Sequence, residues 1–133
     1  MSFLLDTNIA SAHLKRPRGL IQRFIQHSGL LYISTVSLAE LYVWVNQASD
    51  PESRVQAVER MLQHEVRALP FDEACAQRFG QLRFTLRRVG VTVNAVDLLI
   101  ASGALAYDMT LVTHNTKHFA SIPDLRLEDW LQD

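Results

Sequence analysis

Cysteine is almost absent from this sequence, with Cys75 as the only one among 133 residues. A lone thiol excludes both an internal disulfide framework and a zinc site built from several cysteines, and it fits a protein of the reducing cytosol. Within "DEACAQRF" we interpret Cys75 as a small buried apolar residue of a helix rather than as a nucleophile.

Long apolar runs and an excess of either charge are also missing. No segment approaches the roughly eighteen apolar residues of a membrane-spanning helix, and Asp6 comes too early for a signal peptide. We therefore expect a cytoplasmic protein that does not contact a membrane. Lys and Arg number 13 and Asp and Glu 14, so the chain does not coat nucleic acid through bulk charge, although a local basic strip can still bind phosphates.

What the sequence does contain is an alternation of short apolar runs with longer stretches of helical period. Hydrophobic residues make up 48% and charged residues 20%, which is typical of a globular protein. The alternation predicts an α/β fold whose parallel sheet is covered by helices on both faces. Repeats, low-complexity tracts and linker composition are absent, so we expect a single domain over residues 1–133. The expected strands are "FLL", "LLYIS", "EVRALPF", "TLVT" and, at an edge, "LRLEDWL".

The expected helices are marked by the residues at their ends. "RPRGLIQRFIQH" predicts a short helix, Ser37 opens "SLAELYVWVNQA", and Asp50 starts "PESRVQAVERMLQH". Asp72 is expected to cap "EACAQRFGQLRFTLRRVG", which closes at Gly90. "VDLLIASGALAY" is apolar on nearly all sides, which predicts a buried helix.

Three acids fall at strand ends or in the helices that follow them: Asp6 after "FLL", Glu40 in "ISTVSLAE" and Asp97 in "TVNAVD". Each has a purely structural explanation. Asp6 fits a helix N-cap, Ser37 and Glu40 match an S-x-x-E capping box, and Asn94 with Asp97 mimics one with a shorter acid. Taken one at a time, these acids need no function.

Parallel topology weakens that explanation, because it brings the segments that carry these acids to one edge of the sheet. Two unit charges about 4 Å apart repel by roughly 4 kcal/mol at an effective dielectric of about 20, whereas a cap stabilises by about 1 kcal/mol. Such a cluster persists only when it is protonated or bridged by cations, and oxygen ligands without His or Cys favour Mg²⁺ or Mn²⁺. The sequence therefore predicts metal-assisted hydrolysis of a phosphodiester.

The segments around these acids also resemble a known family. "LLDTNI", "ISTVSLAEL", "LPFDEACAQRFGQLR", "NAVDLLIASGAL", "TLVTHNTKHF" and "LRLEDWL" are similar, in that order, to the motifs of PIN-domain ribonucleases, and most closely to VapC toxins of toxin–antitoxin operons. The resemblance implies a three-layer α/β/α sandwich with a mostly parallel sheet. It also implies a Mg²⁺- or Mn²⁺-dependent endoribonuclease that cuts translation-related RNA, often tRNA. The implied assembly is a homodimer, held inactive in a hetero-oligomer by a VapB-type antitoxin.

The same resemblance assigns roles to residues of this chain. Asp6 and Asp97 match the family's direct metal ligands, and Glu40 matches the acid that steers the metal or a water. Thr7 and Asn8 match the polar pair that follows the first acid, with Thr7 orienting the Asp6 carboxylate.

One departure from the family concerns the segment "THNTKHF". Many members have a fourth acid there, whereas this chain supplies Asn115 and, three residues on, His118. Asn115 can orient a water or a carboxylate but brings no charge, so we expect one firmly bound ion in the free protein and a second with RNA. His118 and His114 are candidates for phosphate contacts or proton donors, and equally for ordinary exposed loop residues.

Other features leave alternatives open. Two basic groups fit either rims that position RNA or solvated helix faces: Lys15, Arg16 and Arg18, and Arg83, Arg87 and Arg88. Trp44 and Trp130 are expected in the core or an interface. A phospho-receiver-like module needs paired acids after its first strand, and a dehalogenase-like phosphatase needs an acid where Asn8 stands. An inactive PIN-like scaffold that binds without cutting remains an alternative.

Overall fold

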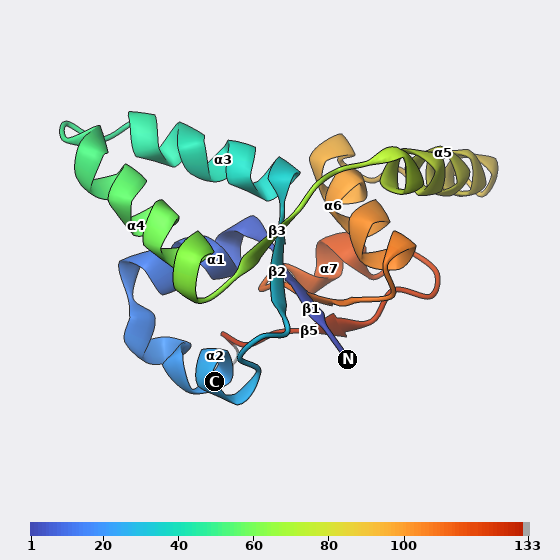
Figure 1. The fold of residues 1–133 in the computed structure, drawn as a ribbon. Helices are drawn as coiled ribbons and strands as arrows, with labels where there is room; N and C mark the ends of the chain where they lie inside the picture. Colours follow the sequence, from blue (N-terminus) through green and yellow to red (C-terminus); the bar gives the residue numbers. More distant parts are fainter. Residues whose placement is uncertain (132–133) are drawn as a thin grey trace.

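A computed structural model describes residues 1–131 and contains a five-stranded sheet in the order β3-β2-β1-β4-β5 (Figure 1). All four strand pairings are parallel, which confirms the expected α/β architecture. The strands are β1 (Phe3–Leu5), β2 (Leu31–Ser34), β3 (Arg67–Leu69), β4 (Thr110–Val112) and β5 (Leu127–Glu128). The strand order reverses on the two sides of β1, and ligands of such sheets bind at this place, beyond the carboxyl ends of the strands.

Helices cover both faces of this sheet, so the molecule has three layers (Figure 1). The helices α3 and α4 form a hairpin, while α5 packs along α6. None of the helices within residues 1–131 is long and apolar enough to cross a membrane. The helical segments are α1 (Thr7–Lys15), the 3-10 turn η1 (Pro17–Gly19), α2 (Ile21–Gln26), α3 (Thr35–Asn46), α4 (Pro51–His64), α5 (Glu73–Arg88), α6 (Ala95–Ala106) and α7 (Thr116–Phe119).

The central strand β1 divides the hydrophobic core into two clusters. Phe3 and Leu5 belong to the cluster with α1 and α2, whereas Leu4 belongs to the cluster with α5 and α6. Successive side chains of a strand point to opposite faces, so a fully apolar strand must be covered on both sides. The unbroken apolar run "FLL" is therefore what a central parallel strand requires. Trp130 is buried in the first cluster and stacks on His27, as expected for a core tryptophan.

Several expected helix boundaries are confirmed. Asp72 caps α5 by accepting a hydrogen bond from the Cys75 N–H at 3.1 Å, and Gly90 follows α5 with a φ of +75°. The Asn94 side chain caps α6, with 2.9 Å from its Oδ1 to the backbone nitrogen of Val96. Cys75 is buried, and this burial raises the pKa of its thiol. A raised thiol pKa agrees with a packing role rather than a nucleophilic one.

Two helix predictions are wrong. The chain passes from β2 straight into α3, so the cap is Ser34, whose Oγ lies 3.0 Å from the Val36 nitrogen. Ser37 is instead buried inside the helix, and the capping box of Ser37 with Glu40 does not form. The segment "RPRGLIQRFIQH" is also not one helix, because η1 and α2 are separated at Leu20.

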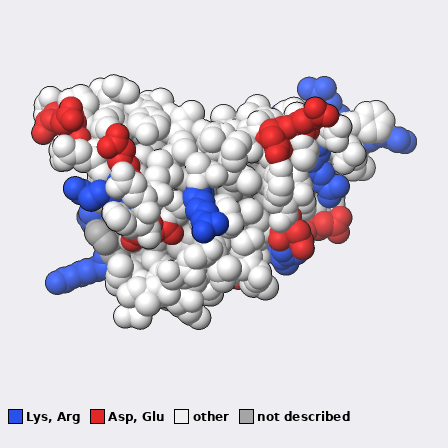
Figure 2. Space-filling model, viewed as in Figure 1, with Lys and Arg blue, Asp and Glu red and all other residues white. Residues whose placement is uncertain are grey.

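Charges of both signs are spread over the molecule. On the face shown in Figure 2, most Lys, Arg, Asp and Glu side chains lie toward the two ends, a basic side chain also lies near the middle, and neither sign covers the surface. This distribution fits the near-equal totals of 13 basic and 14 acidic residues. Binding of a polyanion must therefore depend on local groups of cations.

Candidate active site

Asp6 lies where β1 ends and α1 begins, in the middle of the carboxyl edge of the sheet. Its backbone N–H still donates to the carbonyl of Val112 at 2.8 Å, so the residue remains aligned with β4. One carboxylate oxygen accepts the Thr7 N–H at 2.8 Å, and the other accepts the Thr113 hydroxyl at 2.7 Å. Only 5% of Asp6 is exposed, so its orientation is fixed by these two donors.

The environment of Asp6 disfavours its negative charge. Burial is the main cause that raises the pKa of Asp6, and the carboxylates of Asp97 and Glu40 raise it further. The hydrogen bonds from Thr113 and Thr7 act in the opposite direction without reversing the shift. The structure thus brings the predicted acids close enough to repel one another, although they lie far apart in the sequence.

Asp97 occupies the first turn of α6. Because Asn94 already caps this helix, the Asp97 carboxylate is not needed as a cap. Burial raises the pKa of Asp97, with Glu40 adding to the effect, whereas His118 lowers it. The His118 Nδ1 lies 3.5 Å from an Asp97 oxygen, so the structure brings this predicted supporting residue into contact with the acid.

Glu40 is exposed on α3 and is oriented by the side chain of Thr7. The Thr7 hydroxyl donates to a Glu40 oxygen, while only the backbone N–H of Thr7 reaches Asp6. The Thr7 side chain therefore orients the second acid rather than the first, which differs from the expectation. Thr7 can contact both acids because it is the first residue of α1. Its backbone N–H points back to the cap residue Asp6, while its side chain points sideways to Glu40.

Thr113 is a residue of this edge that the sequence analysis missed. It directly follows β4 and is fully buried, and its hydroxyl donates to Asp6 while accepting the Asn115 N–H at 3.0 Å. The candidate Asn115 stands at the N-cap position just before α7, but its side chain makes no capping bond. A polar residue placed directly after a buried apolar strand was the available signal, since Thr113 ends "TLVT" as Asp6 ends "FLLD".

We expect Thr113→Val to lower cleavage activity and divalent-ion affinity by about 10- to 100-fold, the usual cost of removing a residue that orients a ligand. Valine keeps the volume, but the Asp6 carboxylate loses a donor and its pKa rises further. Thr113→Ser retains the hydroxyl and is the matched control. Cleavage rates and magnesium titrations measure the effect; a folded valine variant with wild-type rates would show that Thr113 only fills space.

A further acid, Asp129, reaches the same edge from the segment after β5. One of its oxygens lies 3.1 Å from the His114 Nδ1, and the other accepts the Leu131 N–H at 2.9 Å. The His114 backbone N–H in turn donates to the Asn8 side chain at 3.3 Å. His114 is therefore held between Asn8 and Asp129, and it has a structural role that the sequence did not reveal.

The donor set fits a hard divalent cation only in part. Asp6, Asp97 and Glu40 offer oxygen ligands alone, as Mg²⁺ and Mn²⁺ prefer. Within residues 1–131, however, no three His, Cys, Asp or Glu side chains form a ready-made metal cluster. Mg²⁺ needs only one or two carboxylates when waters and a phosphate complete its shell, so a preformed cage is not required.

Comparison with known proteins identifies the family. The pattern of the PIN domain matches residues 3–125. The chain is 34% identical over 131 residues to the tRNA(fMet)-specific endonuclease VapC of Shigella flexneri, covering 98% of each chain. It is 34% identical over 133 residues to ribonuclease VapC2 of Rickettsia felis, again covering 98% of each.

Solved structures agree with the sequence relatives. DNA-bound VapBC from Salmonella typhimurium superposes with a TM-score of 0.91 at 32% identity over 98% of each chain. VapBC2 from Rickettsia felis, bound to a promoter DNA fragment, gives a TM-score of 0.89 at 33% identity over 98% of this chain and 99% of that one. The chain therefore belongs to the PIN-domain family and, within it, to the VapC ribonucleases.

Proposed function

We propose that Asp6, Asp97 and Glu40 form an active site that uses Mg²⁺ or Mn²⁺ to hydrolyse RNA phosphodiester bonds. The observation that supports this most is that burial raises the pKa values of Asp6 and Asp97 and neighbouring carboxylates raise them further, because a bound cation relieves both effects. PIN-domain nucleases are generally dependent on divalent metals. Asp6 and Asp97 are the proposed ligands, with Glu40 completing the metal site.

A divalent ion in this site supplies positive charge to the scissile phosphate and lowers the pKa of a bound water. Within the protein, Thr113 and the Thr7 backbone hold Asp6 in one orientation. Glu40 is exposed and oriented by the Thr7 hydroxyl, so it is the carboxylate placed to accept the proton of the attacking water. As this water bonds to phosphorus, the phosphorus–oxygen bond on the opposite side breaks in line, and the leaving oxygen takes up a proton from solvent to become a hydroxyl.

The remaining site residues have supporting roles. His118, which is 60% exposed at its side chain, is placed to donate to a phosphate oxygen while it contacts Asp97. Asn115 offers an amide rather than a carboxylate at this edge, in keeping with one firmly bound ion in the free protein and a second that arrives with RNA. The Asn8 side chain accepts a hydrogen bond from the His114 backbone and so fixes the start of the segment that carries Asn115 and His118.

The relatives suggest the substrate and the partner. The Shigella flexneri relative is named for tRNA(fMet), so we propose tRNA or another translation-related RNA as the substrate of this chain. The structures from Salmonella typhimurium and Rickettsia felis are VapBC complexes, so we propose a toxin of a type II toxin–antitoxin pair that a VapB-type antitoxin neutralises. We also propose a homodimer, a cytoplasmic location and a single domain over residues 1–133.

The test of the site uses isosteric amides. We expect Glu40→Gln and Asp97→Asn to fold normally and to lose at least about a hundredfold of RNA cleavage, since each removes a charge that acts in the transition state. Purified variants are compared on total RNA with Mg²⁺, and mapping of the cut sites identifies the RNA. Asp50→Asn is the matched control, because Asp50 is exposed at the start of α4 and its side chain makes no capping bond.

Two results would reject this assignment. If the variants cut RNA at the wild-type rate, Glu40 and Asp97 have only a structural role. A wild-type protein that binds RNA without cutting it, with either metal, would favour the inactive scaffold.

A further inference from the structure

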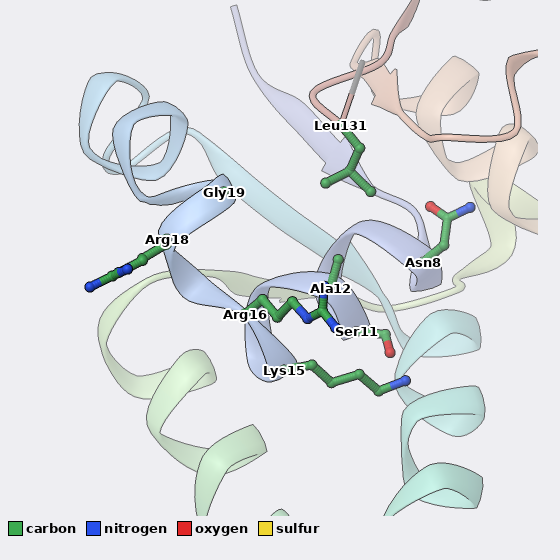
Figure 3. A pocket seen from close by; sticks show the side chains of 8 residues that line it. All are labelled: Asn8, Ser11, Ala12, Lys15, Arg16, Arg18, Gly19 and Leu131. Carbon is green, nitrogen blue, oxygen red and sulfur yellow. The ribbon is translucent and has the colours of Figure 1, made fainter. Parts of the chain in front are cut away.

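A groove runs along the exposed side of α1, next to the candidate active site. Asn8, Ser11, Ala12 and Lys15 line one wall, and Figure 3 shows Leu131 facing them from the C-terminal segment. Arg16, Arg18 and Gly19 extend the lining beyond the end of α1. Its volume of about 970 Å³ lies at the upper end of the range for ligand sites in proteins.

The groove starts at the active site and leads away from it. Asn8 stands two residues after Asp6, and its side chain is bonded to the loop after β4. An α-helix rises 1.5 Å per residue, so Ser11 lies about 7.5 Å and Lys15 about 13.5 Å beyond Asp6 along the helix axis. If the reacting bond of a polymer substrate lies at Asp6, the monomers next to that bond on one side lie in this groove.

The cations that line the groove are not neutralised by carboxylates of the described residues. Lys15, Arg16 and Arg18 are exposed, no carboxylate lines the groove, and among residues 1–131 none of the three forms an ion pair. The Lys15 ammonium lies 5.8 Å from the centre of the Trp44 ring, which holds it at the side of the groove facing α3. Figure 3 shows Arg18 pointing away from the other labelled side chains. Lys15 and Arg16 are thus the two cations available to an anionic ligand inside the groove.

We propose that this groove binds the sugar-phosphate backbone of the RNA strand on one side of the cleaved bond, with Lys15 and Arg16 as its phosphate contacts. This proposal rests on the RNA-cleaving function proposed above. Uncompensated cations beside hydroxyl and amide groups suit phosphates and ribose, and contacts of this kind position a strand without reading its sequence. The aliphatic stems of Lys15 and Arg16, with Ala12 and Leu131, provide apolar surface against which sugars and bases pack.

The test compares the double variant Lys15→Gln/Arg16→Gln with a control that loses the same charge. Arg60→Gln/Arg67→Gln is that control, because both residues lie outside the groove and Arg67 begins β3 at the opposite edge of the sheet. Binding of bulk tRNA is measured in EDTA, which prevents cleavage, over a range of salt concentrations. Cleavage is then measured on the mapped RNA.

We expect the double variant to bind bulk tRNA about tenfold more weakly than the control. Its plot of log affinity against log salt should be shallower by about 1.4, since each lost phosphate contact on a single strand removes about 0.7. Cleavage of the mapped RNA should fall in parallel.

The outcomes separate this proposal from the proposed function. If the wild type cuts RNA and the double variant matches the control in affinity, salt slope and cleavage, the groove does not bind RNA. If the double variant escapes neutralisation by the co-expressed antitoxin with its tRNA binding unchanged, the groove belongs to the antitoxin and the proposal is overturned. If the wild type cuts no RNA at all, the proposed function itself fails.

Discussion

Asp6→Asn is expected to inactivate the protein and, at the same time, to raise the melting temperature of its metal-free form. Asparagine removes a buried negative charge that the surroundings disfavour. Its carbonyl can still accept the Thr7 N–H, and its amide can donate to the Thr113 oxygen after that hydroxyl turns. The substitution therefore keeps the local hydrogen bonds while it relieves the repulsion from Asp97 and Glu40.

The pH dependence of this effect has a definite sign. Burial raises the pKa of Asp6 above its ordinary value of 3.8, so the folded protein binds this proton more tightly than the unfolded chain does. The contribution of Asp6 to stability is complete below pH 3.8 and is lost as the pH rises through the folded-state pKa. In EDTA, the melting temperature of the wild type should therefore fall relative to that of Asp6→Asn between these two values. For a domain of this size, each kcal/mol corresponds to about 4 °C.

The loss of activity should be at least about a thousandfold, because a metal ligand contributes several kcal/mol to the stabilisation of the transition state. Asp72→Asn is the contrasting control. Tyr107 and the Cys75 N–H hold the pKa of Asp72 below its usual range, so its charge is favoured and its loss should not stabilise the protein. Cleavage by Asp72→Asn should equal that of the wild type. If Asp6→Asn instead destabilises the metal-free protein at neutral pH, the buried charge of Asp6 does not destabilise the folded protein.

Removal of divalent ions is expected to abolish cleavage completely. EDTA should stop the reaction, and excess Mg²⁺ or Mn²⁺ should restore it. The carboxylates of the site are negatively charged, so without a cation they cannot stabilise the negative charge of the phosphate. Bound metal should also stabilise the wild type by about 2.7 kcal/mol at a hundredfold excess over the dissociation constant. The variants Asp6→Asn and Asp97→Asn should show little of this stabilisation.

Thermal melts with and without Mg²⁺ measure that gain, and cleavage assays on the same samples measure the activity. Cleavage that persists in EDTA would contradict a metal mechanism. It would direct attention instead to the histidines of this edge, His114 with its Asp129 partner and His118 beside Asp97.

The fold could be predicted largely from the sequence because its signals are local. The strands β1, β2 and β4 coincide with apolar runs, and caps such as Asp72 and Asn94 act on residues two or three positions away. The capping box of Ser37 failed for an equally local reason. It assumed a loop between β2 and α3, and the chain has none, so Ser34 takes that role.

The candidate site was only partly predictable. Parallel topology was sufficient to bring Asp6, Glu40 and Asp97 to one edge, because it requires only the order of strands. It could not predict which side chains meet across that edge. The Thr113 hydroxyl donates to Asp6, 107 positions earlier in the chain. The Thr7 hydroxyl bonds to Glu40 rather than to Asp6 because of its rotamer, which the hydrophobic periodicity of the sequence does not predict.

The central position of β1 has a consequence for synthesis of the protein. Asp6 is among the first residues to leave the ribosome, but its hydrogen-bonding partner Thr113 and the neighbouring strand β4 are made near the end. A nascent chain therefore carries Asp6, the first acid of the proposed active site, long before the Asp6 side chain is fixed in place. We therefore expect the proposed active site to form only after β4 and Thr113 have been made.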